Sequence, residues 1–177
     1  MVKELDPNEI LCREFEYAAQ SAFQANEDRV RVFNYYLATM GTMIAASVFA
    51  DLTNSMYLEV FGLAIGILAI LGFIFVLKLI KLRMSWKESV QAMCKIKEYY
   101  IENYDESLKK AFEWKSKTIP SVGKINSVAF LMGLIIMTLS SASAAGAVYF
   151  WGKALEKIWD SWSIKVGTIV FMGQILV

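Results

Sequence analysis

The segment NEDRVRVFNYYLATMGTMIAA (residues 26–46) changes from polar to apolar without a proline that would end a helix. Its first six residues include Glu27, Asp28, Arg29 and Arg31, whereas no charge occurs from residue 33 to residue 50. A helix that leaves water and enters lipid has this composition, because the bilayer core disfavours charged side chains. The segment therefore predicts one continuous helix that passes from the cytosol into a membrane.

Other runs of the chain are also long enough to cross a bilayer. A hydrocarbon core about 30 Å thick needs roughly 20 apolar residues in a helix. Residues 33–50, 56–77 and 126–152 approach or exceed this length, with Glu59 the one charge among them. Residues 164–177 are fewer and include Lys165, so they form a short or tilted fourth span, a re-entrant segment or an interfacial helix; we favour the span. Because 56% of the residues are apolar and strand-like alternation is absent, we expect an all-α integral membrane protein with three to four transmembrane helices.

The distribution of basic residues predicts the orientation. Residues 78–124 carry eleven basic and six acidic residues, whereas the connection 51–55 carries no Lys or Arg. The positive-inside rule places the N-terminus and residues 78–124 in the cytoplasm. The charges expected at the membrane edge are Arg29, Arg31, Lys78, Lys81 and Arg83.

This orientation divides the chain into four parts. Residues 1–32 form a cytoplasmic N-terminal amphipathic helix, and residues 33–80 a transmembrane helical hairpin. Residues 81–125 form a cytoplasmic charged helix with its connector. Residues 126–177 hold the third transmembrane helix and the short fourth hydrophobic segment.

Two cytoplasmic segments carry apolar stripes at helical spacing. Asp6 followed by Pro7 is typical of a helix start, because Asp caps the first free N–H groups and Pro fits the first helical position. Residues then recur every three or four positions, which predicts that both segments are helical and pack as a long antiparallel hairpin. The second segment runs from about residue 84 to residue 117 and continues from the second span. The stripes are Leu11, Phe15, Ala18, Ala22, Ala25, Arg29, Val32 and Tyr36 in the first segment, and Trp86, Val90, Met93, Lys97, Tyr100, Tyr104, Leu108 and Ala111 in the second.

The residue types present argue against an enzyme. The chain has no histidine, which excludes histidine-containing triads and histidine zinc sites, and its two cysteines, Cys12 and Cys94, match no metal or redox spacing. We interpret both cysteines as small buried residues that stay reduced in the cytoplasm. We expect no catalytic residue, no cofactor and no metal.

Small residues mark the places where helices can approach closely. Gly62 and Gly66 form a GxxxG pair, and Gly41 with Ala45 has the same spacing. The run SSASAAG (140–146) lines a pore or a subunit seam, or else packs tightly with its hydroxyls bonded to the backbone; its candidate packing residues are Ser140, Ser143 and Gly146. We expect added bulk at Gly62 and Gly66 to disturb assembly more than bulk at Gly72.

Several charges have two interpretations. Arg29 pairs across a subunit interface, lines the mouth of a pore, or anchors the helix at the headgroup level. Asp51 and Glu59 are either acids at the mouth of a pore or ordinary interfacial acids. The acids interspersed among the basic residues of 78–124 disfavour nucleic acid as a partner.

Three of these segments together resemble the SLATT-like, four-helix membrane proteins of prokaryotic antiviral defence systems. The resemblance covers roughly residues 8–117 and rests on architecture: EDRVRVFNYYL (27–37) leads into the first span, GLAIGILAILGFIFVLKLIKLR (62–83) forms the second span with its basic exit, and YYIENYDESLKKAF (99–112) lies on the following helix. The resemblance implies a location in the bacterial inner membrane and oligomeric membrane disruption, triggered by an enzyme or sensor encoded at the same locus.

Two functions remain open from the sequence. The first is a homo-oligomeric, pore-forming or membrane-disrupting effector in the lipid bilayer. The alternative is a non-conducting membrane sensor or scaffold that binds a soluble cytoplasmic partner. Leakage of a dye from liposomes separates them.

Overall fold

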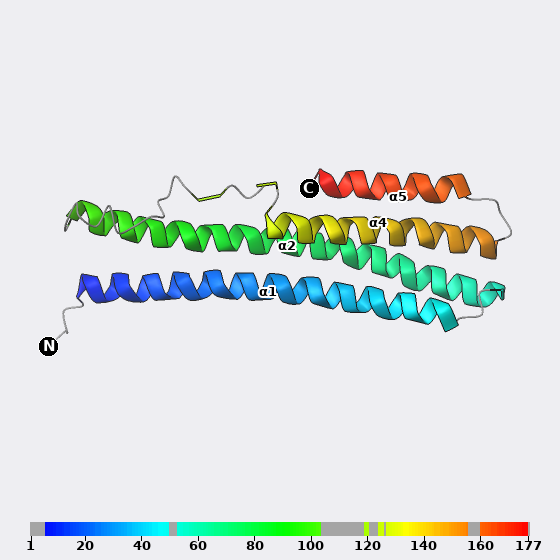
Figure 1. Ribbon diagram of the computed structural model, residues 1–177, viewed down its shortest axis with the longest axis horizontal. Helices are drawn as coiled ribbons and strands as arrows, with labels where there is room; N and C mark the ends of the chain where they lie inside the picture. Colours follow the sequence, from blue (N-terminus) through cyan, green and yellow to red (C-terminus); the bar gives the residue numbers. More distant parts are fainter. Residues whose placement is uncertain are drawn as a thin grey trace. The chain divides into compact units, whose positions relative to one another are not determined.

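The computed structural model describes residues 6–49, 53–103, 119–120, 124–125, 127–155 and 160–176. Four helices lie in these residues: α1 (Pro7–Phe49), α2 (Ser55–Asn103), α4 (Val128–Ala154) and α5 (Asp160–Ile175) (Figure 1). No described residue belongs to a strand, so the predicted all-α class is confirmed.

Three helices, α1, α2 and α4, are long and apolar enough to cross a membrane. α1 has 43 residues and α2 has 49. At 1.5 Å per residue α1 is about 65 Å long, twice the thickness of a bilayer core, so a polar part must extend beyond any span. The prediction of one unbroken helix through residues 26–46 is therefore confirmed. The predicted continuation of α2 towards residue 117 lies outside the described residues.

The fourth hydrophobic segment forms a shorter helix. α5 has 16 residues, which corresponds to about 24 Å. This is less than the thickness of a bilayer core of about 30 Å, so among the described residues three helices have the length of a span and α5 does not.

Local capping explains where two of the helices begin. The Asp6 carboxylate accepts a hydrogen bond from the Asn8 backbone N–H at 2.9 Å, and Pro7 is the first helical residue of α1, as predicted. Ser127 caps α4 by accepting a bond from the Phe130 backbone N–H at 3.2 Å. Each cap satisfies an N–H group that has no partner inside the helix.

The chain divides into two compact units. Unit 1 comprises Met1–Arg29 and Lys81–Ile125, and unit 2 comprises Val30–Ile80 and Asn126–Val177. Both α1 and α2 contribute residues to each unit.

In unit 1, the stripe of α1 is its buried side. Ala18, Ala22 and Ala25 are buried, and Ala22 packs with Val90 and Cys94 of α2 in a small core. The larger, partly buried side chains of Trp86, Met93 and Ile119 cover this core. Alanines let two backbones approach closely, and in this unit Ala22 of α1 packs directly against α2. The predicted long cytoplasmic hairpin stays a prediction.

The two cysteines of unit 1 differ in exposure. Cys94 is buried, as predicted, but Cys12 is exposed, so its interpretation as a buried residue was wrong. Cys12 immediately follows the stripe residue Leu11, and a step of one residue turns a side chain by about 100° to another side of the helix.

We expect a maleimide to label Cys12 at least about tenfold faster than Cys94 at neutral pH, because alkylation requires an exposed thiolate. Burial raises the pKa of the Cys94 thiol, and this further reduces its thiolate fraction. Mass spectrometry of the detergent-solubilised protein measures both rates, with Cys12→Ser and Cys94→Ser as single-site references. Equal rates would show that the core of unit 1 opens readily.

In unit 2, α5 lies antiparallel beside α4 (Figure 1). Tyr36 of α1 is fully buried and packs edge-on against Phe75 of α2, with ring centroids 5.7 Å apart. Ile136 of α4 is fully buried as well. All four helices thus contribute residues to this unit.

Candidate functional site

A chain of two buried hydrogen bonds joins three helices of unit 2. The Gln174 amide nitrogen of α5 donates to the Ser140 hydroxyl of α4 at 2.8 Å. The Ser140 hydroxyl in turn donates to the Ala69 backbone carbonyl of α2 at 2.8 Å. Ser140 is 0% exposed and Gln174 is 1% exposed, so neither bond competes with solvent. In a low-dielectric environment such bonds fix the positions of the helices that they connect.

Gly72 of α2 lies against this chain at very short range. A Cβ atom added at Gly72 would lie 2.5 Å from the Ser140 Cβ and 2.6 Å from the Tyr36 hydroxyl oxygen. Only glycine leaves room for both neighbours. Because Ser140 is also bonded to Gln174, residues from α1, α2, α4 and α5 meet at this point. We call Tyr36, Ala69, Gly72, Ser140 and Gln174 the polar centre.

One polar atom of the polar centre lacks a hydrogen-bond partner among the described residues. It is the buried side-chain oxygen of Gln174, whereas the Tyr36 hydroxyl lies beside the hydroxyls of Ser140 and Ser143. An unpaired buried oxygen has a desolvation cost that is not recovered on folding. The Gln174 oxygen is therefore an acceptor that this part of unit 2 still has available.

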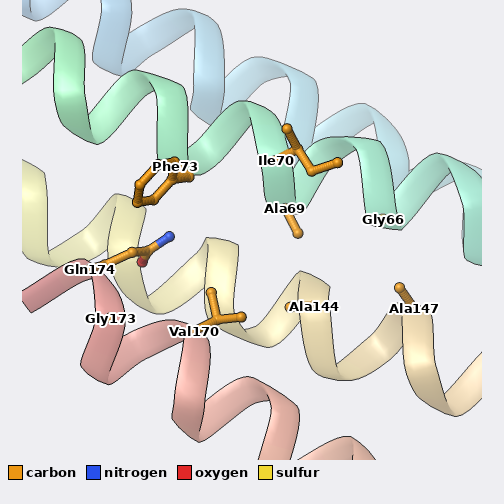
Figure 2. A pocket seen from close by; sticks show the side chains of 9 residues that line it. All are labelled: Gly66, Ala69, Ile70, Phe73, Ala144, Ala147, Val170, Gly173 and Gln174. Carbon is orange, nitrogen blue, oxygen red and sulfur yellow. The ribbon is translucent and has the colours of Figure 1, made fainter.

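A cleft of about 590 Å³ adjoins the polar centre. Figure 2 shows Phe73 and Gln174 at one end of the cleft, and Gly66 and Ala147 towards the other. Apart from Gln174 its lining side chains are apolar, so the cleft suits a hydrocarbon group. The lining residues are Gly66, Ala69, Ile70, Phe73, Ala144, Ala147, Val170, Gly173 and Gln174.

The predicted packing residues of α2 lie against α4. A Cβ added at Gly62 would lie 2.9 Å from the Trp151 ring, and one at Gly66 would lie 3.7 Å from the Ala147 Cβ. The Trp151 ring nitrogen donates to the Glu59 carbonyl at 3.3 Å, which holds the ring over Gly62. The clearance at Gly66 is ordinary contact, and among these three glycines of α2 the shortest distance from an added Cβ is at Gly72. The effect of bulk at the three positions on assembly stays a prediction.

The serine-rich run of α4 is bonded to backbone. Ser143 donates to the Leu139 carbonyl at 2.9 Å and is within 3.6 Å of the Met40 sulfur. A Cβ added at Gly146, on the same helix, would lie 3.7 Å from Ile65. Of the two interpretations of this run, its buried hydroxyls favour tight packing over a pore lining.

The second small-residue pair, Gly41 and Ala45 of α1, lies apart from these contacts. A Cβ added at Gly41 would meet nothing within 4 Å, and Ala45 is exposed. The structure of one chain therefore gives these two residues no packing partner among the described residues.

The charged side chains expected at the membrane edge differ in their exposure. Arg31, Lys78 and Lys81 are exposed. Arg29 and Arg83 are the two that are partly or largely buried, and the Arg29 guanidinium donates to the Asn26 side-chain oxygen at 2.7 Å.

Of the two acids proposed for a pore mouth, the structure describes Glu59. Glu59 is exposed, and its backbone carbonyl is the acceptor of the Trp151 bond. Asp51 lies outside the described residues.

From the sequence, Gly72 had less weight than the GxxxG pair, and Gln174 was not singled out. Gln174 is an amide in an apolar run, the kind of residue that bonds across helices in a membrane. That signal was present, but its partner Ser140 is 34 residues away. Gly72 has no small residue four positions away in either direction, so no spacing motif marked it.

The described residues contain no group of three or more His, Cys, Asp or Glu side chains that could hold a metal ion. The polar centre joins helices to one another, and Gln174 places one unpaired acceptor beside an apolar cleft. Comparisons of this chain with protein-family models, curated proteins and solved structures found no match. Its function therefore has to be argued from its own residues.

Proposed function

We propose that the protein is a non-enzymatic, homo-oligomeric membrane protein of bacterial antiviral defence, which acts in the inner membrane as a pore-forming or membrane-disrupting effector. The three long apolar helices support the membrane location. The resemblance to SLATT-like proteins supports the defence role. The observation that carries the oligomeric part is the open face of α1.

One face of α1 presents small residues that no described residue covers. Asn34, Ala38, Gly41 and Ala45 recur at steps of four, three and four, and all are exposed. They lie on the side of the helix opposite the buried Tyr36. In the apolar window of α1 11% of the residues are buried, compared with 28% in α2 and 22% in α4. Small residues in a membrane helix are typical of faces where another helix approaches, so this face fits a second copy of α1.

The length of α1 suggests how a signal would reach this face. The same helix carries Ala22 in the core of unit 1 and Gly41 in its apolar part. A partner that alters the packing of the unit 1 segments would therefore act on a helix that continues into the span. We propose this route for activation by a soluble protein from the same locus.

The alternative function, a non-conducting scaffold or sensor, has its own supporting observation. Tyr17 is 70% exposed and Phe23 is 64% exposed, both on the part of α1 that belongs to unit 1. Exposed aromatic side chains are typical of binding surfaces for another protein. This alternative predicts partner binding without leakage.

Leakage of a dye from liposomes that contain the purified protein tests the proposal. We expect Gly41→Leu to reduce the leakage rate about tenfold, equivalent to about 1.4 kcal/mol of lost association. The leucine would keep the α1 faces of two copies apart. Gly133→Leu is the matched control, because a Cβ at Gly133 also meets nothing within 4 Å. Equal leakage from both variants would contradict the proposed seam, and no leakage from the unmodified protein would favour the scaffold.

The proposed orientation predicts where Cys12 can be labelled. A membrane-impermeant maleimide should label the exposed Cys12 in inverted inner-membrane vesicles but not in intact spheroplasts, because the N-terminus is proposed to be cytoplasmic. A Cys12→Ser variant gives the background. Labelling in spheroplasts alone would reverse the orientation.

A further inference from the structure

Unit 1 contains two arginines whose burial is unusual for a charged side chain. Arg83 of α2 is only 9% exposed, and its guanidinium carbon lies 4.4 Å from the centroid of the Trp86 ring. Arg29 of α1 is partly buried and is held by its bond to Asn26. The aromatic stack and the amide bond fix the two guanidinium groups, so neither side chain is loose on the surface.

The positive charge of Arg83 acts on Arg29. Burial, and after it the charge of Arg83, lowers the pKa of Arg29. Burial also lowers the pKa of Arg83. Like charges brought together with reduced hydration repel, and this arrangement costs free energy unless an anion lies with them.

No anion from the described residues supplies that compensation. The Nε atoms of Arg29 and Arg83 are both buried without a hydrogen-bond partner. Neither guanidinium has a hydrogen bond or an ion pair to a carboxylate of the described residues. Two fixed guanidinium groups with free N–H donors and no carboxylate form an incomplete anion site.

We propose that Arg29 and Arg83 together bind a phosphate group. Guanidinium N–H donors match the oxygen atoms of phosphate and bind them in a bidentate manner. Arg29 precedes the first apolar run by four residues and Arg83 follows the second by six, counting from Phe33 and Leu77. If these runs cross the bilayer, the pair lies at the depth of the headgroups, where anionic lipids present phosphate. A soluble phosphate could fill the same site.

The test measures the thermal midpoint of the full chain in an uncharged detergent. Three probes are added separately: dioleoylphosphatidylglycerol, dioleoylglycerol with the same acyl chains and no phosphate, and inorganic phosphate at ionic strength matched with sodium chloride. We expect phosphatidylglycerol to raise the midpoint by about 4 °C or more, because a ligand that binds only the folded chain stabilises it. Dioleoylglycerol should raise it by less than half as much. An equal response to inorganic phosphate would identify a soluble source, whereas a response to phosphatidylglycerol alone would identify a lipid. No response to either phosphate probe would overturn the proposal.

Variants assign the response to the pair. Arg29→Gln should raise the midpoint without added phosphate, because it removes the repulsion with Arg83, and should lose more than half of the response to phosphatidylglycerol. Arg83→Gln should lose the response as well. Lys81→Gln, two residues from Arg83 but exposed, removes the same charge and should respond like the unmodified chain. Equal losses in Lys81→Gln and Arg29→Gln would show general attraction to basic residues and would overturn the site. A lower midpoint for Arg29→Gln without added phosphate would overturn it as well.

Discussion

Gly72→Ala is expected to destabilise unit 2 by about 2–3 kcal/mol, although alanine is the better helix former by up to about 1 kcal/mol. The added methyl group would lie 2.5 Å from the Ser140 Cβ and 2.6 Å from the Tyr36 hydroxyl oxygen. A Cβ is fixed to the backbone and cannot rotate away, so α2 and α4 would have to separate. Separation would also strain the bond from Ser140 to the Ala69 carbonyl. Unfolding of the detergent-solubilised chain by added sodium dodecyl sulfate, followed by circular dichroism, measures this loss.

Two glycine positions serve as matched controls. Gly66→Ala should be neutral or stabilising by up to about 1 kcal/mol, because its new methyl group would be at an ordinary 3.7 Å from the Ala147 Cβ. Gly133→Ala should behave in the same way, since nothing lies within 4 Å. If the Gly72→Ala variant is as stable as these two variants, the helices do not approach closely at the polar centre.

Much of the helical architecture follows from the sequence, because it depends on properties that each segment carries by itself. The uncharged runs require long apolar helices, and the cap at Asp6 and Pro7 explains where α1 begins. The stripe of Ala18, Ala22 and Ala25 is local as well, because helical spacing places these residues on one face whatever they pack against.

The polar centre could not be predicted in this way, because it depends on which residues meet. The GxxxG pair at Gly62 and Gly66 lies against α4, but among the glycines of α2 the shortest distance from an added Cβ is at Gly72, which belongs to no spacing motif. The reason is the size of the neighbours opposite each position. Gly66 faces an alanine, whereas Gly72 faces both a serine and a tyrosine.

The same limit applies to the last helix. In the sequence, the short length of residues 164–177 and the charge of Lys165 are compatible with a tilted span, a re-entrant segment or an interfacial helix. The bond from Gln174 to Ser140 shows that the end of α5 is attached to α4 in unit 2. This attachment is a contact between distant residues, and no local pattern encodes it.

Ser140→Ala is expected to destabilise the chain by about 1–2 kcal/mol, because it leaves the Gln174 amide and the Ala69 carbonyl without their shared partner in a buried site. Gln174→Leu alone should cost less, since it removes one hydrogen bond together with a side-chain oxygen that has no partner among the described residues. The double variant Ser140→Ala with Gln174→Leu should then be more stable than the sum of the two losses predicts, by about 0.5–1.5 kcal/mol, because the leucine removes the amide that Ser140→Ala leaves unpaired.

The four forms make one thermodynamic cycle in the same detergent unfolding assay. Thr138→Val is the control for loss of a hydroxyl, because Thr138 is exposed on α4 and its hydroxyl donates to a backbone carbonyl of its own helix. This control should change stability by less than about 0.5 kcal/mol. Strictly additive losses would mean that Gln174 and Ser140 do not interact, and α5 would then be held only by apolar contacts beside α4. A positive coupling instead identifies the amide and the hydroxyl as the link between the two helices.

Because that link ends on the carbonyl of Ala69, three residues before Gly72, its loss should also reduce the cost of Gly72→Ala. With the hydrogen bond removed, α4 can move away from α2 more easily.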